Sequence, residues 1–173
     1  MLTTMRDTDR IERIRTEMEA RVEASACTAR MRRFIRKDFY IVTAKMFLAN
    51  HEKVSKLTAL MRTMETAVEK SKHLTSHMED DASVTLECSH YYIRLISPLS
   101  QRLLKAVLSV DRINAILVKM EVKGKITRQD RLKLIVEPLK HLEEIKTVAL
   151  DLPPPLTKEQ RQEAKKAQAI APG

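Results

Sequence analysis

Only two glycines occur among the 173 residues, and this scarcity constrains the fold more than any other feature. Glycine is the residue that allows tight turns, bulges and phosphate-binding loops. A chain this poor in glycine disfavours α/β enzymes and β-sandwiches. Abundant Leu, Ile, Ala and Met, set against only six aromatic residues, favours helices packed on helices. We predict a mainly α fold, a helical bundle with one or two short strands.

The clearest helical pattern covers residues 52–78. Val54, Leu57, Met61, Met64 and Val68 are spaced by three and four residues, which places them on one face. Such a stripe is typical of a coiled-coil-like hairpin or of a seam between two chains. Further helices are expected at 8–20, from near Ala29 to 49, from Ser97–Pro98 to about Met120, and after Thr127, the last kinked by Pro138.

Two segments alternate with a period of two, as strands do. Residues 20–27 alternate Val and Ala with polar side chains, although their Ala and Glu content also suits a continued helix. Residues 83–94 alternate more regularly and are richer in β-branched and aromatic side chains. A single strand is not stable alone, so each must pair with another segment or with its copy in a second chain.

Length and composition predict one helical domain over residues 1–150 and a Pro-rich spacer with a polar tail over 151–173. No apolar run approaches the roughly 18 residues of a membrane span, and the charged start of the chain has no signal-peptide core. We therefore expect a cytoplasmic protein that does not bind membranes. Two cysteines, Cys27 and Cys88, are too few for a disulfide scaffold, so we expect reduced thiols.

No catalytic motif is present in the sequence. Two isolated glycines cannot form a nucleotide-binding loop, and neither cysteine lies in an activating context. Cys88 with His90 and His73 with His77 could supply four zinc ligands, but nothing in the sequence brings the two pairs together. We expect a protein that is not an enzyme and that uses neither a metal nor a cofactor.

The net charge of +9 is concentrated in two basic regions, residues 1–37 and 82–148. Within the first region, ten residues from Thr28 to Lys37 carry five positive charges and no negative one. On a helix these form two neighbouring rows that could contact a phosphate backbone, Arg30, Arg33 and Lys37 in one and Arg32 and Arg36 in the other. The preceding segment adds Arg21, Glu23 and Ser25 on one side, where Arg21 could reach a base.

The stretch from Val84 to about Ile145 resembles a known family. The shared features are an alternating strand with a His (Val84–Tyr92), the Ser97–Leu104 segment, Asp111 in a helix, and Gly124-Lys-Ile-Thr-Arg128. The family is a domain of unknown function encoded on conjugative plasmids and integrative and conjugative elements. Some members regulate transfer genes and are described as modified ribbon-helix-helix DNA-binding proteins.

The resemblance implies a DNA-binding regulator of conjugative-transfer genes whose strands enter the major groove of double-stranded DNA. It also implies a homodimer, and the stripe on 52–78 offers a possible seam. Either strand, 20–27 or 83–94, could read the DNA. The alternative is a helical adaptor that binds other proteins of a conjugation or secretion apparatus through its tail.

Overall fold

A computed structural model describes residues 21–153 and residue 160. The elements in order are β1 (Arg21–Ala26), α2 (Ala29–Lys37), α3 (Phe39–Phe47), α4 (His51–Leu74), β2 (Ser89–Arg94), α5 (Pro98–Val122) and α6 (Arg128–Ala149). About two-thirds of the described residues are helical, which confirms the predicted mainly α bundle with short strands. The helix expected at 8–20 and nearly all of the predicted tail lie outside the described residues.

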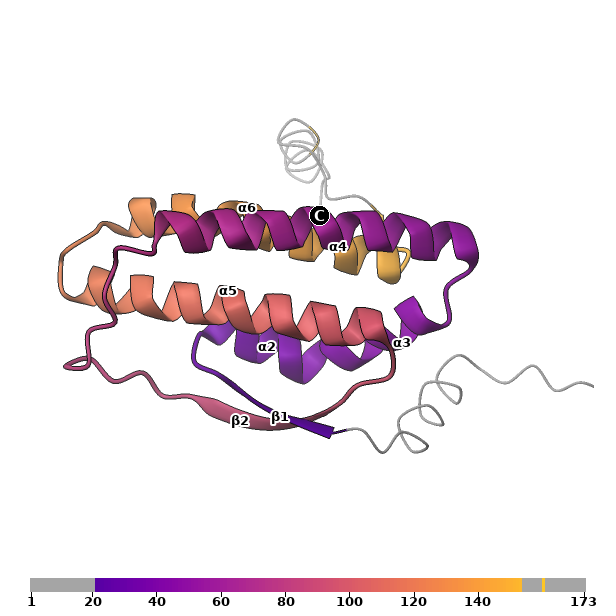
Figure 1. Ribbon diagram of the computed structural model, residues 1–173, viewed down its shortest axis with the longest axis horizontal. Coiled ribbons are helices and arrows are strands. Elements are labelled where there is room, and N and C mark those ends of the chain that lie inside the picture. Colours follow the sequence, from indigo (N-terminus) through magenta and orange to yellow (C-terminus); the bar gives the residue numbers. More distant parts are fainter. Residues whose placement is uncertain (1–20, 154–159, 161–173) are drawn as a thin grey trace, which may run out of the picture.

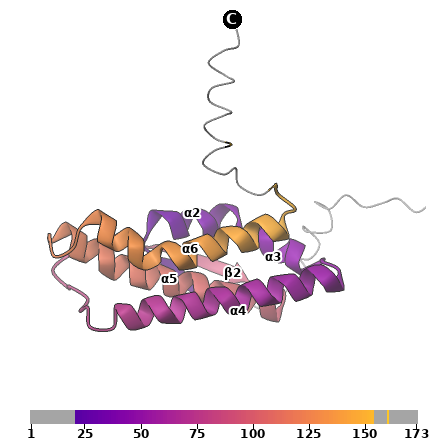
Figure 2. The same ribbon diagram turned by 90° about the horizontal axis from the view of Figure 1, so that it is seen from above.

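Figure 1 shows the two strands along one edge of the molecule and helices α4 and α6 along the opposite edge. Helices α5, α2 and α3 lie between these edges. Seen from above in Figure 2, α4 and α6 run side by side along the length of the molecule. The strands therefore form an outer layer supported from one side by helices.

Strands β1 and β2 pair with each other, antiparallel, in a two-stranded ribbon. The register runs from Arg21 opposite Arg94 to Ala26 opposite Ser89. The strand predicted at 20–27 is confirmed, and the helical alternative there is wrong. The strand predicted at 83–94 is only half right, because residues 83–88 are irregular. Because β1 ends at Ala26, which pairs with Ser89, the residues before Ser89 have no partner strand with which to form backbone hydrogen bonds.

The single helix predicted over 29–49 is interrupted at Asp38. Helix α2 ends at Lys37, and α3 begins at Phe39. The interruption lets apolar residues of both segments face the core. The rings of Phe34 and Phe39 pack edge to face there, with 6.5 Å between their centroids. A straight helix could not bury both groups, because their positions do not fall on one narrow stripe.

A capping residue starts each of the three long helices, and two of these, Ser97 and Thr127, are the predicted ones. The Asn50 side chain accepts from the Lys53 N–H at the start of α4. Ser97 and Ser100 form a capping box at α5, with Pro98 in the first turn, and Thr127 and Asp130 form another at α6. Helix α5 ends before Gly124, whose φ of 69° is in the left-handed region that glycine adopts at low cost.

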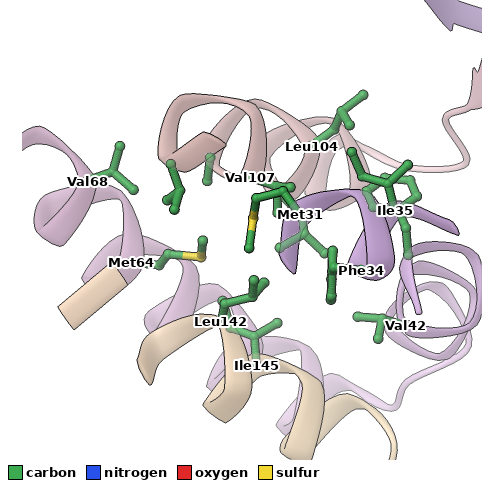
Figure 3. Packing of buried hydrophobic residues seen from close by; sticks show 14 of the residues in the cluster. Met31, Phe34, Ile35, Val42, Met64, Val68, Leu104, Val107, Leu142 and Ile145 are labelled. Carbon is green, nitrogen blue, oxygen red and sulfur yellow. The ribbon is translucent and has the colours of Figure 1, made fainter. Parts of the chain in front are cut away.

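All five described helices contribute to one core. In Figure 3, Met31 and Phe34 of α2 converge with Met64 of α4, Val107 of α5 and Ile145 of α6. The predicted stripe on α4 is part of this core, since Leu57, Met61, Met64 and Val68 are almost fully buried within one chain. The stripe is thus the seam of an intramolecular bundle, and β1 already has its partner in β2. A homodimer would need a different surface.

Cys27 and Cys88 form a disulfide across 61 positions of the sequence. The prediction of reduced thiols is therefore wrong for this structure. The two cysteines immediately follow β1 and precede β2, so ribbon pairing brings them together, which their spacing in the sequence could not reveal. Among the described residues, no helix combines the length and apolar character that crossing a membrane requires.

Candidate nucleic-acid interface

The outward face of the ribbon carries polar side chains from both strands. Alternation along β1 turns Ala24 and Ala26 into the core and leaves Arg21, Glu23 and Ser25 exposed. The register then sets these three opposite Arg94, Tyr92 and His90 of β2, respectively. The three β1 residues predicted as a site are thus brought together on one solvent-facing surface.

Sequence reasoning missed the β2 half of this surface. His90 is exposed, and Tyr92 is 71% exposed, more than any other large hydrophobic residue in the described part of the chain. The available signal was the alternation over 83–94, which already placed His90, Tyr92 and Arg94 on one side. We refer to the six outward residues as the ribbon face: Arg21, Glu23, Ser25, His90, Tyr92 and Arg94.

One end of the ribbon is anchored to α5 by a buried carboxylate. Asp111 is only 2% exposed, and its two oxygens accept from the backbone N–H groups of Cys27 and Thr28 at 2.8 Å each. The Thr28 hydroxyl also donates to Asp111, at 2.6 Å. Thr28 occupies the N-cap position of α2 without a side-chain cap of its own. Asp111 therefore satisfies the N–H of the N-cap residue and places at the start of α2 the negative charge that a helix N-terminus favours.

The other end of the ribbon is held by Tyr40 of α3. Its hydroxyl donates to the carbonyl oxygen of Tyr92 at 3.1 Å and accepts from the Arg94 N–H at 3.2 Å. A free strand edge exposes such groups to pairing with another chain. Tyr40 satisfies them here and fixes the strand against the helical body.

The predicted basic cluster divides between two sides of α2. Arg30, Arg33 and Lys37 line a groove of about 540 Å³ between α2 and α6. Arg30 pairs with Glu143 of α6 at 3.1 Å, and Asp38 pairs with Lys146 at 2.8 Å. The absence of neighbouring acids in the sequence was misleading, because the compensating carboxylate comes from a helix more than a hundred residues away.

Arg32 and Arg36 do not line this groove, and the backbone of α2 at Arg32 approaches β2. The hydroxyl of Tyr91, on β2, lies 3.5 Å from the Arg32 carbonyl oxygen. Arg36 is exposed and Arg32 partly so, and neither forms an ion pair within the part of the chain that the structure describes.

The described residues form neither the zinc site nor the cysteine nucleophile that the sequence could have supplied. Cys88 is oxidised and cannot serve as a thiolate ligand or nucleophile in this state. Over residues 21–153, no three His, Cys, Asp or Glu side chains are grouped so as to hold a metal ion.

No family model and no curated protein matches the chain. Among solved structures, the fold is similar to a crystal structure of selenomethionine-containing AcaB from uropathogenic E. coli. The TM-score is 0.57 at 11% identity, over 86% of this chain and 84% of that one. At this identity the likeness concerns the fold alone, and it extends over most of both chains.

Proposed function

We propose that this protein binds double-stranded DNA without catalysing a reaction, using the ribbon face as its reading surface. The observation that carries the proposal is an exposed, polar, two-stranded antiparallel ribbon on a protein of net charge +9. The major groove of B-form DNA is wide enough to admit a two-stranded ribbon, and side chains projecting from it can reach base edges.

The roles of the side chains follow from their chemistry. Arg21 is suited to bidentate contact with guanine, Glu23 can accept from cytosine, and Tyr92 can contact the thymine methyl group. Arg32 and Arg36, which do not line the α2–α6 groove, would contact phosphates, which fix register without choosing a sequence. Arg30, Arg33 and Lys37 would then contribute mainly long-range attraction, because they lie toward α6 and part of their charge is compensated there.

A role in regulating conjugative-transfer genes is the most specific form of the proposal. Its support is the resemblance of residues 84–145 to the family of conjugative elements, together with the presence of a ribbon followed by helices in the structure. Both strands of the ribbon come from one chain, so one chain would supply a complete reading element. A cytoplasmic location belongs to the same proposal.

A homodimer remains part of the proposed assembly, although the α4 stripe cannot form it. Exposed apolar residues on α6, Leu132 and Val136, lie four positions apart and offer another surface. Sedimentation velocity at micromolar concentration is expected to show a species of twice the 19.9 kDa chain mass. A single species of the chain mass would refute the dimer and leave the DNA proposal standing.

The test is DNA binding by fluorescence anisotropy, over a series of salt concentrations, with promoter DNA from conjugative elements and a scrambled duplex. Affinity should fall steeply with salt as counterions are released. Arg32→Ala should weaken binding to both duplexes and flatten the salt dependence, and Arg33→Ala should do so less. Arg21→Ala and Tyr92→Ala should reduce the preference for the promoter. Arg62→Ala, an exposed arginine on the distant helix α4, is the matched control.

Absence of binding to either duplex at low salt would overturn the proposal. The adaptor function would then replace it, with residues 152–173 as the predicted docking segment. Deletion of that segment separates the two functions, because it should leave DNA affinity unchanged in a regulator and abolish partner binding in an adaptor.

A further inference from the structure

The disulfide is a continuation of the ribbon. Successive pairs run from Arg21 opposite Arg94 to Ala26 opposite Ser89, and the next positions in that register are Cys27 and Cys88. Their Cα atoms lie 4.0 Å apart. The covalent bond therefore closes the ribbon at the end remote from the Tyr40 clamp, immediately beside Ser25 and His90 of the ribbon face.

The two halves of this disulfide are held very differently. Cys27 is fixed to α5, because its backbone N–H donates to the buried Asp111 carboxylate. Cys88 instead ends a stretch, residues 78–88, that contains neither helix nor strand. Ion pairs at the surface tie this stretch to α5, Lys119 with Asp80 at 2.6 Å and Lys123 with Asp81 at 4.0 Å. In each pair one partner is exposed, Asp80 in the first and Lys123 in the second, and ion pairs at the surface contribute modestly to stability.

The disulfide is also within reach of a reductant. Both cysteines are partly exposed, and both line a groove of about 590 Å³ that is bounded by β1, residues 80–88 and α5. In proteins of reducing compartments, disulfides are usually transient and serve catalysis or redox sensing. A bond that is accessible, and whose two halves differ in how firmly they are held, suits reversible opening better than permanent reinforcement.

We propose that Cys27–Cys88 is a site of reversible thiol–disulfide exchange that controls the ribbon face. A dithiol donates two electrons and two protons, the S–S bond breaks to give two thiols, and the dithiol becomes a disulfide. Cys27 stays on Asp111, while Cys88 and the start of β2 are released. His90 then loses its fixed position opposite Ser25, so the reading surface is complete only in the oxidised protein.

The output of this switch, DNA affinity, and its cytoplasmic setting rest on the proposed function, whereas the conformational change on reduction does not. The experiment therefore has two readouts on the full chain after oxidation and after treatment with a dithiol, with thiols counted by alkylation and mass spectrometry. Hydrogen–deuterium exchange should rise over residues 78–94 on reduction and remain unchanged in α4 and α6. Affinity for promoter DNA should fall about 10-fold if the competent ribbon is then populated a tenth of the time.

The double variant Cys27→Ser, Cys88→Ser should behave as the reduced protein and no longer respond to the dithiol, which controls for other effects of the reagent. Equal exchange over 78–94 in both redox states would overturn the proposal. It would equally fail if the bond resisted reduction at the glutathione ratios of the cytoplasm. If exchange rises on reduction but neither state binds DNA, the switch stands and the proposed function falls.

Discussion

The Ser71 hydroxyl of α4 donates to the carbonyl oxygen of Leu134 in α6 at 2.8 Å. Leu134 lies four residues before Pro138, and a proline has no N–H to give to that carbonyl. Ser71 is only 3% exposed and lies where α4 packs on α6. A neighbouring helix thus supplies the donor that the proline removes, and the chain can keep a buried proline within a continuous helix.

Replacing Ser71 with Ala should lower the free energy of unfolding by about 1 kcal/mol, because it leaves the partly buried Leu134 carbonyl without its partner. The loss should be much smaller in a Pro138→Ala background, where the new N–H can donate to Leu134. Urea denaturation of the four proteins in this double-mutant cycle measures the coupling. Ser76→Ala, an exposed serine just beyond the end of α4, serves as control. Additive effects of the two changes would contradict this interpretation.

Asp111→Ala should destabilise the protein by roughly 3 kcal/mol, because it leaves two backbone N–H groups and one hydroxyl without their shared acceptor. Asp111→Asn should be intermediate, since an amide oxygen can accept from Thr28 but its NH2 group cannot accept from Cys27. Denaturation and amide exchange at residues 27–30 test both. The adjacent exposed residue gives the control Arg112→Ala, which should change stability by less than about 0.5 kcal/mol.

Met61→Asp should unfold the single chain, because it introduces an unpaired charge at a position that is 0% exposed within the monomer. The expected result is loss of cooperative thermal unfolding by circular dichroism at every protein concentration. Val136→Asp, at a position 55% exposed, should leave the fold intact. Dissociation of Met61→Asp into folded monomers would instead show that this residue lies between two chains.

The Glu65–Arg102 pair should make stability depend on acid pH. Hydrogen bonds of 2.8 and 2.7 Å from the Arg102 guanidinium hold the pKa of Glu65 below its ordinary value of 4.5. Stability from this pair is therefore fully present above that value and is lost as the pH falls through the lower, folded-state pKa. Because both side chains are more than one-third exposed, we expect at most about 1 kcal/mol.

Glu65→Gln should remove that contribution at pH 7 and flatten the decline of unfolding free energy below about pH 5. The more exposed Glu69 provides a comparison, and Glu69→Gln should leave the pH profile of urea denaturation unchanged. A Glu65→Gln profile parallel to that of the unaltered protein would show that the pair does not contribute.

Features that depend on near neighbours in the sequence were predictable. The apolar spacing of α4 and the capping residues Ser97 and Thr127 belong to single elements, and the structure has those elements where expected. The prediction of one helix over residues 29–49 was wrong. Apolar side chains there occur on several sides of a helix, so their spacing did not indicate the break at Asp38. The pattern on α4 specified a buried face but could not say whether its partner lay in the same chain.

Features that depend on distant parts of the chain were not predictable in the same way. The pairing of Cys27 with Cys88 follows from the ribbon register, and the role of Asp111 follows from the approach of α5 to the end of β1. Likewise, Arg30 meets Glu143 only because α2 packs beside α6. Local patterns correctly placed Arg21, Glu23 and Ser25 on one side of β1, but the residues facing them required knowledge of the partner strand.

A ribbon built from two different strands of one chain has no internal twofold symmetry. Ribbons formed by two identical chains present the same residues twice, and their DNA sites are correspondingly palindromic. Here Arg21, Glu23 and Ser25 lie opposite Arg94, Tyr92 and His90, so the two halves of the ribbon face differ in charge and shape. If this face reads DNA as proposed, each chain has a direction on the duplex, and the sequence under one ribbon need not equal its own reverse complement.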